Sequence, residues 1–467
     1  MHPELSRTFG RQHSFHRRLV YLTILGITSL FLTSSLIGSA QASNVKPAVV
    51  GNTGTASAGN TGTTSPSVPY TTSLVLIGPN QLIGGLYQPV SPDPNQSIAL
   101  LLTHGDANFI GTTPCLQLAQ RGFTVLCVKT QYDAEGPVIW DNLALDVSVS
   151  VSYLRSLPTV KKVLLVGYSG GGAIVSYYQN VAENGIATCQ APARLDPCSS
   201  SLANMSPADG VVMLDSVAGA YNRFIDLDAS IVNEKNLNLR DSALDMFNPA
   251  NGYNPNGSSN YSRAFIDRYT VAQGQREARI VAMAERDLKE IANGTAQYSD
   301  DVPFPTGRDN AEISEADLNV IAHTQGEYPV ISPQYPNGSP PQVVNSNRPV
   351  TNNEASDLSW TAKPGDFTAE SYMSTSAIIA PDLHITADSI TGVDWASTNT
   401  SPIVNVAGIK TPILFMGLTA SMDTDPVTQE MFYQAAVNTT NKTLVYVYGA
   451  THGLTPCTNC GTPSSQT

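Results

Sequence analysis

A serine between glycines gives the strongest chemical signal in this sequence. The motif is Gly167-Tyr168-Ser169-Gly170-Gly171. An apolar run over residues 163–167 leads into it and a helical apolar pattern follows it, which is the strand–turn–helix setting of a nucleophile elbow. On so sharp a turn, the residues two before and two after the serine must lack side chains. A glycine-rich turn can also bind phosphate, but no lysine follows these glycines. The pattern therefore predicts Ser169 as a nucleophile.

Through this motif the sequence resembles the α/β-hydrolase superfamily over residues 73–217 and 408–452. The resemblance implies an α/β fold with a mostly parallel sheet and flanking helices. It also implies a serine hydrolase whose triad runs in the order serine, acid, histidine, with the acid after a late strand and the histidine after the last one.

Four histidines remain once an N-terminal leader is set aside, and the implied order selects among them. His104 precedes the nucleophile, while His323 and His384 lie between the two resembling segments. His452 follows the last predicted strand after a short turn. Its imidazole can accept a proton and return it near neutral pH. We expect His452 to be the catalytic base.

Three aspartates are candidates for the acid. Asp423 and Asp425 both follow the apolar run at residues 413–417. Asp423 is preferred, because Asp425 directly precedes Pro426 and has the pattern of a helix N-cap. Asp215, after an earlier strand, stays a third candidate because some members of the superfamily resemble that arrangement.

The oxyanion of an acyl-transfer reaction needs two backbone N–H donors. Gly170, directly after the nucleophile, is expected to supply one. The other should come from the loop after residues 98–103, where His104-Gly105-Asp106-Ala107 resembles the family's His-Gly pattern. Asp106 is the expected donor, with Ala107 as the alternative, since a carboxylate beside an oxyanion is unfavourable unless it turns away.

The predicted elements fit such a core. Two short apolar runs look like a hairpin, and the later continuous runs look like strands buried on both faces. Residues 147–152 alternate valine and serine, as in a strand, yet Ile139, Leu143, Val147 and Val151 form a row with helical spacing. We favour a helix there. The hairpin covers residues 74–77 and 82–87, the strands 98–103, 123–128, 163–167, 210–215, 413–417 and 443–448, and a further helix 426–437.

The resembling segments are separated by a large insertion, residues 218–408, which we interpret as a mainly helical and irregular cap over the active site. Its clearest element is a helical stretch over residues 280–291, closed by Gly294. Phe265, Ile266 and Tyr269, just upstream, could form apolar walls for a substrate or could equally pack cap against core. The cap is expected to select the substrate without supplying a triad residue.

The N-terminus has the features of an export signal. Arginines precede an apolar run at residues 19–37, and Ala40-Gln41-Ala42 follows. This predicts a signal peptide over residues 1–42 and a secreted or periplasmic protein, with an uncleaved membrane anchor as the alternative. Residues 43–72 read as a flexible Ser/Thr/Gly linker. The core would then comprise residues 73–217 and 409–467.

The charge balance argues against two kinds of partner. The sequence has 25 basic and 38 acidic residues, and the leader contains four arginines and Glu4. Without the leader, 21 basic and 37 acidic residues leave a net charge of −16. Such a charge disfavours binding to nucleic acid or to an anionic membrane.

Six cysteines in an exported chain predict disulfides. The local pairs Cys189 with Cys198 and Cys457 with Cys460 are expected. The Cys-Thr-Asn-Cys spacing of the second pair is also found in redox and zinc motifs.

These features together predict an enzyme that hydrolyses carboxylic esters of small or polymeric substrates. Two alternatives stay open: acyl transfer to an alcohol by the same triad, and a binding protein that kept the fold without catalysis. No metal-ligating pattern is visible, so no cofactor is expected. The sequence does not indicate the oligomeric state.

Overall fold

The computed structural model describes residues 67–105, 107–130, 137–297, 304, 311–332, 340–351, 367–458 and 460. The predicted signal peptide at residues 1–42 lies outside these residues. The same holds for the predicted linker up to residue 66 and for Asp106.

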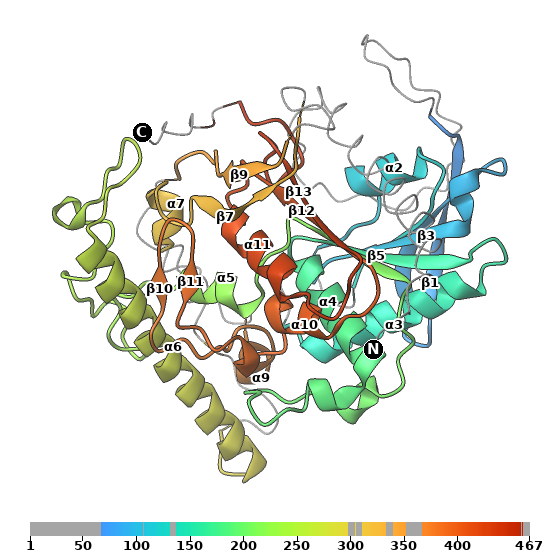
Figure 1. Cartoon of the computed structure of the whole chain (residues 1–467). Helices are drawn as coiled ribbons and strands as arrows, with labels where there is room; N and C mark the ends of the chain where they lie inside the picture. The colour runs from blue at the N-terminus through green and yellow to red at the C-terminus, as the bar shows by residue number, and fades with distance from the viewer. Residues whose placement is uncertain are drawn as a thin grey trace, which may run out of the picture.

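A nine-stranded sheet forms the centre of the molecule (Figure 1), in the order β1-β2-β4-β3-β5-β6-β12-β13-β8. The pairs β1/β2 and β2/β4 are antiparallel, and every pair from β4 to β8 in this order is parallel. The predicted mostly parallel sheet is therefore confirmed. The strands are β1 (Tyr70–Ile77), β2 (Leu82–Pro89), β3 (Ile98–Thr103), β4 (Thr124–Val128), β5 (Lys162–Tyr168), β6 (Gly210–Leu214), β8 (Val330–Ile331), β12 (Ile413–Leu418) and β13 (Lys442–Val447).

The apolar strands are buried on both faces because helices cover both sides of the sheet. Ala99 and Leu101 of β3 enter one core cluster, and Leu100 and Leu102 enter another. The first cluster contains side chains of α3, α4, α10 and α11, and the second contains those of α2. These helices are α2 (Thr113–Ala119), α3 (Trp140–Ser156), α4 (Gly170–Asn184), α10 (Pro402–Gly408) and α11 (Pro426–Ala435).

The ambiguous valine–serine segment is helical, as predicted, and lies within α3. Val147 and Val151 are buried on its inner face. The Ser150 hydroxyl donates to the Asp146 carbonyl at 2.7 Å, and the Ser152 hydroxyl donates to the Ser148 carbonyl at 2.9 Å. Serines can bond back to the preceding turn in this way, so alternation alone does not exclude a helix.

The interval between β6 and β12 carries most of the remaining elements. Its long helix α6 packs against α5, α9 and β10 (Figure 1). Phe265 and Tyr269 lie inside α6 and are buried in the main core cluster, so their part is packing. The elements are α5 (Ala220–Ile225), α6 (Arg263–Ala292), α7 (Ile313–Ala316) and α9 (Ala369–Thr375), and the pairs β7 (His323–Tyr328) with β9 (Gln342–Asn345) and β10 (His384–Ile385) with β11 (Ile390–Thr391). Short 3-10 turns are η1 (Pro94–Ser97), η2 (Ile186–Thr188), η3 (Ser200–Leu202), η4 (Pro249–Asn251) and η5 (Trp395–Ser397).

Two elements cross the boundaries drawn from sequence. Strand β1 begins at Tyr70, within the stretch predicted as linker. Strand β8 comes from the interval assigned to the cap, yet it pairs with β13 and extends the main sheet. Part of that interval is thus built into the core sheet.

Three disulfides join cysteines that are close in sequence. Cys189–Cys198 and Cys457–Cys460 match the predicted pairs, and Cys115–Cys127 links α2 to β4. Among the described residues, no helix combines the length and apolar character needed to cross a membrane.

Candidate active site

Ser169 lies on the tight turn between β5 and α4. Its backbone has φ 56° and ψ −127°, a left-handed conformation that is unfavourable for a residue other than glycine. A Cβ atom at Gly167 would lie 2.4 Å from the Gly171 carbonyl oxygen, and one at Gly171 would lie 2.2 Å from the Thr103 carbonyl oxygen. Both glycines are therefore required for strand and helix to approach, and the Ser169 side chain projects from the turn.

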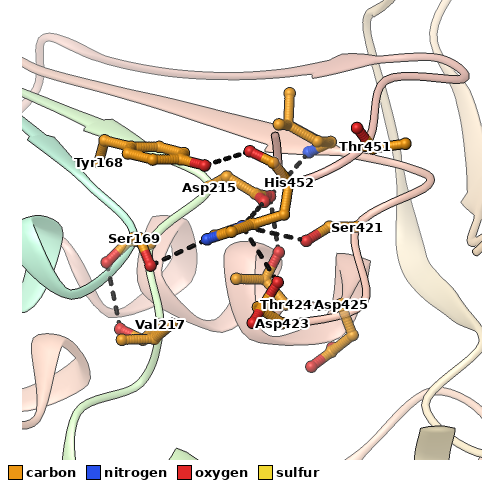
Figure 2. Close-up of polar contacts among 12 residues, drawn as sticks. Tyr168, Ser169, Asp215, Val217, Ser421, Asp423, Thr424, Asp425, Thr451 and His452 are labelled. Carbon is orange, nitrogen blue, oxygen red and sulfur yellow. Dashed lines mark hydrogen bonds and ion pairs between the residues drawn. The ribbon is translucent and has the colours of Figure 1, made fainter. Parts of the chain in front are cut away.

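Three side chains form a continuous hydrogen-bonded row at the carboxyl ends of the strands (Figure 2). Ser169 Oγ lies 2.9 Å from His452 Nε2, and Asp215 Oδ2 lies 2.6 Å from His452 Nδ1. They come from the ends of β5 and β6 and from the loop after β13. The structure thus brings Ser169 and His452 together, with Asp215 as the carboxylate beside the imidazole.

The Asp215 carboxylate is fully buried and its second oxygen is also satisfied. Asp215 Oδ1 accepts a hydrogen bond from the Leu418 N–H at 3.0 Å and another from the Thr424 hydroxyl at 2.6 Å. Its side chain is 0% exposed, and its backbone has a positive φ of 46°. A carboxylate held this tightly has a fixed orientation toward the imidazole.

Asp423 and Asp425, the acids favoured from sequence, occupy other places. Asp423 Oδ2 is 3.9 Å from His452 Nδ1, which is an ion-pair distance, and its side chain is 51% exposed. Asp425 caps α11, accepting from the Thr428 N–H at 2.8 Å, and burial raises its pKa to about 6. The geometry therefore favours Asp215 over the preferred candidate, because only Asp215 combines hydrogen-bond distance with burial.

The electrostatic surroundings raise the pKa of His452 above its ordinary value. Burial by itself lowers this pKa, but the hydrogen bond and charge of Asp215 outweigh it, and the charge of Asp423 acts in the same direction. The imidazole therefore holds a proton more strongly than a free histidine. An imidazole in this place would be stabilised in its charged form if it accepted a proton from a serine hydroxyl.

The structure describes only part of the expected oxyanion site. Gly170 is the first residue of α4, where backbone N–H groups lack a partner within the helix. Gly170, His104 and Gly105 line the same pocket as Ser169. Asp106, the expected second donor, lies outside the described residues, and the structure therefore does not place it.

A cavity of about 140 Å³ opens at Ser169. Val138, Trp140 and Val217 supply apolar surface. Most of the cavity's polar side chains come from the interval between β6 and β12, and one more, Asp423, comes from the β12 loop. Those from the interval are Asn222, Arg223, Asp226, Glu312, Glu315 and Thr375. Burial raises the pKa of Glu312 well above its usual range, and the neighbouring charges of Glu315 and Asp226 raise it further. The cavity therefore mixes an apolar wall with an acidic one.

Sequence reasoning missed the residues that support the row. Ser421 Oγ lies 3.3 Å from His452 Nδ1, and Thr424 bonds Asp215. Tyr168 donates a hydrogen bond to the His452 carbonyl, and their rings stack with centroids 4.9 Å apart. Tyr168 lies inside the elbow motif and Thr424 lies between the two candidate aspartates, yet neither residue type by itself indicates a supporting role. In the part of the chain that the structure describes, no three His, Cys, Asp or Glu side chains are grouped as a metal ion would require.

The sheet order and the position of the elbow define the fold class. A mostly parallel sheet with an antiparallel edge carries the serine after β5, and the histidine follows the late strand β13. The chain thus has the α/β-hydrolase fold.

No protein-family model matches the sequence, and no curated protein matches it. Several solved structures are similar at low identity. Brefeldin A esterase, a bacterial homologue of human hormone-sensitive lipase, is 10% identical, with 96% of this chain and 81% of that chain covered and a TM-score of 0.36. The α/β hydrolase GrgF from Penicillium sp. sh18 is 9% identical, with 82% and 91% covered and a TM-score of 0.36. The acylaminoacyl peptidase of Pyrococcus horikoshii is 8% identical, with 83% and 38% covered and a TM-score of 0.34. Likenesses this weak do not bear on the chemistry.

Proposed function

We propose that the protein is a serine hydrolase that cleaves carboxylic esters, with Ser169 as nucleophile, His452 as base and Asp215 as acid. The observation that carries the proposal is the hydrogen-bonded row Ser169–His452–Asp215, at 2.9 Å and 2.6 Å. A serine, an imidazole and a buried carboxylate in this order are the groups that nucleophilic acyl transfer requires.

The chemistry follows from these positions. His452 Nε2 accepts the Ser169 proton as Oγ attacks the ester carbonyl, while Asp215 holds Nδ1–H and stabilises the imidazolium that forms. The Gly170 N–H faces the developing oxyanion. His452 then protonates the departing alcohol and leaves an acyl-enzyme, and water activated by the same imidazole releases the acid.

The raised pKa of His452 gives the reaction a pH dependence. Only the neutral imidazole can accept the serine proton, so activity is lost as the pH falls through the His452 pKa. The acid limb of the profile should therefore lie above the ordinary histidine value of about 6.5.

We infer esters rather than amides from the chemistry of the leaving group. An alcohol departs more readily than an amine, which must be protonated before it leaves. An ester is thus the less demanding substrate for the same triad. Val138, Trp140 and Val217 supply the apolar side of the cavity at Ser169, where an acyl group would bind. The interval at residues 218–408 would select among substrates, since it supplies most of the polar wall.

Replacement of Ser169 by alanine tests the nucleophile. Turnover of p-nitrophenyl esters should fall by about 10⁶-fold, the scale seen when a serine protease loses its nucleophile. The variant should keep the circular dichroism and melting temperature of the wild type, because the glycines of the elbow are unchanged. A fluorophosphonate probe should label the wild type on Ser169, and labelling at another residue would contradict the assignment. Matching p-nitroanilides provide the amide comparison.

We also propose that the protein is exported and cleaved after Ala42. The leader pattern supports this, and so do the three disulfides, which persist in oxidising compartments. The intact mass of the exported protein should correspond to a chain that begins at Ser43. A mass that retains the leader would favour an uncleaved anchor.

A further inference from the structure

Tyr168 makes two separate contacts with the proposed base (Figure 2). It is the last residue of β5 and directly precedes the nucleophile. Its hydroxyl donates a hydrogen bond to the backbone carbonyl of His452. Its ring also stacks on the imidazole, with centroids 4.9 Å apart and planes 26° apart. The strand that carries the nucleophile is thus in direct contact with the residue that must deprotonate it.

Backbone hydrogen bonds shape the loop that carries His452 and join it to the β12 loop. The Thr451 N–H donates to Thr455 and the Leu454 N–H to Thr451, each at 2.9 Å, while the Cys457 N–H closes on Gly449 at 2.7 Å. The Ala420 N–H donates to Ala450 from the neighbouring β12 loop. None of these four bonds joins the loop to β5. The Tyr168 hydroxyl makes that connection, because its hydrogen bond from β5 ends on the His452 carbonyl.

Two further aromatic rings, of Phe109 and His104, support the Tyr168 ring. Phe109 packs against it at 6.0 Å, and His104 stacks on Phe109 at 5.7 Å with nearly parallel planes. Burial raises the pKa of the Tyr168 hydroxyl, and the charges of Asp215 and Asp423 raise it further, so the hydroxyl remains a donor throughout the working pH range. The hydroxyl therefore keeps the proton that it donates to the His452 carbonyl.

We propose that Tyr168 is a positioning residue for the triad, whose hydroxyl fixes the His452 backbone and whose ring supports the charged imidazolium. This inference rests on the proposed function of Ser169 and His452. The two parts of the side chain have separable effects. The hydroxyl keeps Nε2 within reach of Ser169 Oγ, and small displacements of a catalytic group cost much of its rate. The ring presents its electron-rich face to the imidazole, which favours the protonated form.

Among the residues that the structure describes, the titratable groups facing His452 are Asp215 from the end of β6, Asp423 from the β12 loop and Tyr168 from β5. Both carboxylates raise the His452 pKa, and removal of the Tyr168 ring leaves them in place. A shift of the acid limb that occurs in Tyr168→Leu but not in Tyr168→Phe would therefore report the ring.

Two substitutions separate the two effects. Tyr168→Phe removes the hydroxyl and keeps the ring, so kcat should fall about fivefold, the scale of one ordinary hydrogen bond, with KM and the acid limb unchanged. Tyr168→Leu removes both, so kcat should fall further. Its acid limb should move to lower pH by about half a unit, because the imidazolium loses its aromatic neighbour.

Tyr178→Phe is the matched control, since the buried Tyr178 hydroxyl also donates to a backbone carbonyl, that of Ser206, at 2.5 Å. It should lower the melting temperature at most slightly and leave kcat and the acid limb unchanged. A Tyr168→Phe enzyme as active as wild type would overturn the proposal. So would a loss matched by Tyr178→Phe, which would indicate a general effect on stability. The phenylalanine variant has nearly the shape of tyrosine, so it decides the question even if the leucine variant does not fold.

The rate of fluorophosphonate labelling keeps this test apart from that of the ester reaction. Labelling reports the nucleophilicity of Ser169 whatever the natural substrate is. Normal labelling of the wild type without ester turnover would reject ester hydrolysis and leave Tyr168 testable. Slower labelling of Tyr168→Phe than of wild type and Tyr178→Phe would support positioning, and equal rates in all three would contradict it.

Discussion

The ends of β6 and β12 carry comparable aspartates, and the structure uses them differently. The two strands are parallel neighbours, with Leu214 paired to Met416. Asp215 follows β6 at once, is fully buried and lies 2.6 Å from His452 Nδ1. Asp423 comes five residues after the end of β12, is half exposed and lies 3.9 Å away. Asp215 can orient the imidazole because it lies directly at the end of its strand, where its carboxylate is buried. Asp423 lies further along its loop, and its carboxylate is half exposed.

The β12 loop nevertheless contributes to the site. The Leu418 N–H and the Thr424 hydroxyl hold Asp215 Oδ1, and Ser421 Oγ lies 3.3 Å from His452 Nδ1. A loop in which sequence reasoning expected the acid instead supplies donors to an acid on the neighbouring strand. The two strand ends thus have complementary roles, since one supplies the carboxylate and the other fixes its direction.

Asp215→Asn is expected to have the largest effect on this comparison. The amide would favour the wrong imidazole tautomer, so kcat should fall by about 10⁴-fold, as for the equivalent change in a serine protease. Steady-state kinetics with a p-nitrophenyl ester measures the loss, and circular dichroism checks the fold. A variant that keeps most of its turnover would show that Asp215 is not the acid.

Asp423→Asn should have a much smaller effect, because an exposed ion pair contributes little. We expect kcat on the plateau to change by less than about fivefold. The charge of Asp423 raises the His452 pKa, so its removal lowers that pKa and moves the acid limb of kcat/KM to lower pH. The pH profile of the variant measures the shift.

Asp425→Asn is the matched control for Asp423→Asn, since asparagine caps a helix about as well as aspartate. It should leave both kcat and the acid limb in place. If Asp423→Asn proved as inactive as Asp215→Asn, the roles assigned to the two strand ends would have to be exchanged.

Local patterns were sufficient to predict much of the architecture and part of the candidate site. The hairpin and the buried parallel strands follow from periodicity and turn residues, which depend on near neighbours. The helix at residues 147–152 also required its place between two buried strands, since its valine–serine alternation is that of a strand. The elbow at Ser169 is equally local, because its glycines are needed for one tight turn. His452 could be reached from the chain order that the family resemblance implies.

The choice of acid could not be made in this way. It depends on distances between segments far apart in sequence: Asp215 and His452 are separated by 237 residues. The sequence places an aspartate after each of two strands and does not show that Asp215 has a positive φ or that Leu418 and Thr424 point toward it. Strand β8 was missed for a related reason. Two residues at a sheet edge carry no periodicity of their own, and only pairing with β13 defines them.

The separation between Asp215 and His452 has a consequence for the protein during its synthesis. At about 5–20 residues per second, the ribosome needs on the order of 10 to 50 seconds to add the 237 residues that lead from Asp215 to His452. Over that time a nascent chain of the proposed enzyme contains its nucleophile and its acid but has no base. The unfinished polypeptide therefore cannot hydrolyse esters, and hydrolysis begins only after the β13 loop has been made and folded against β5.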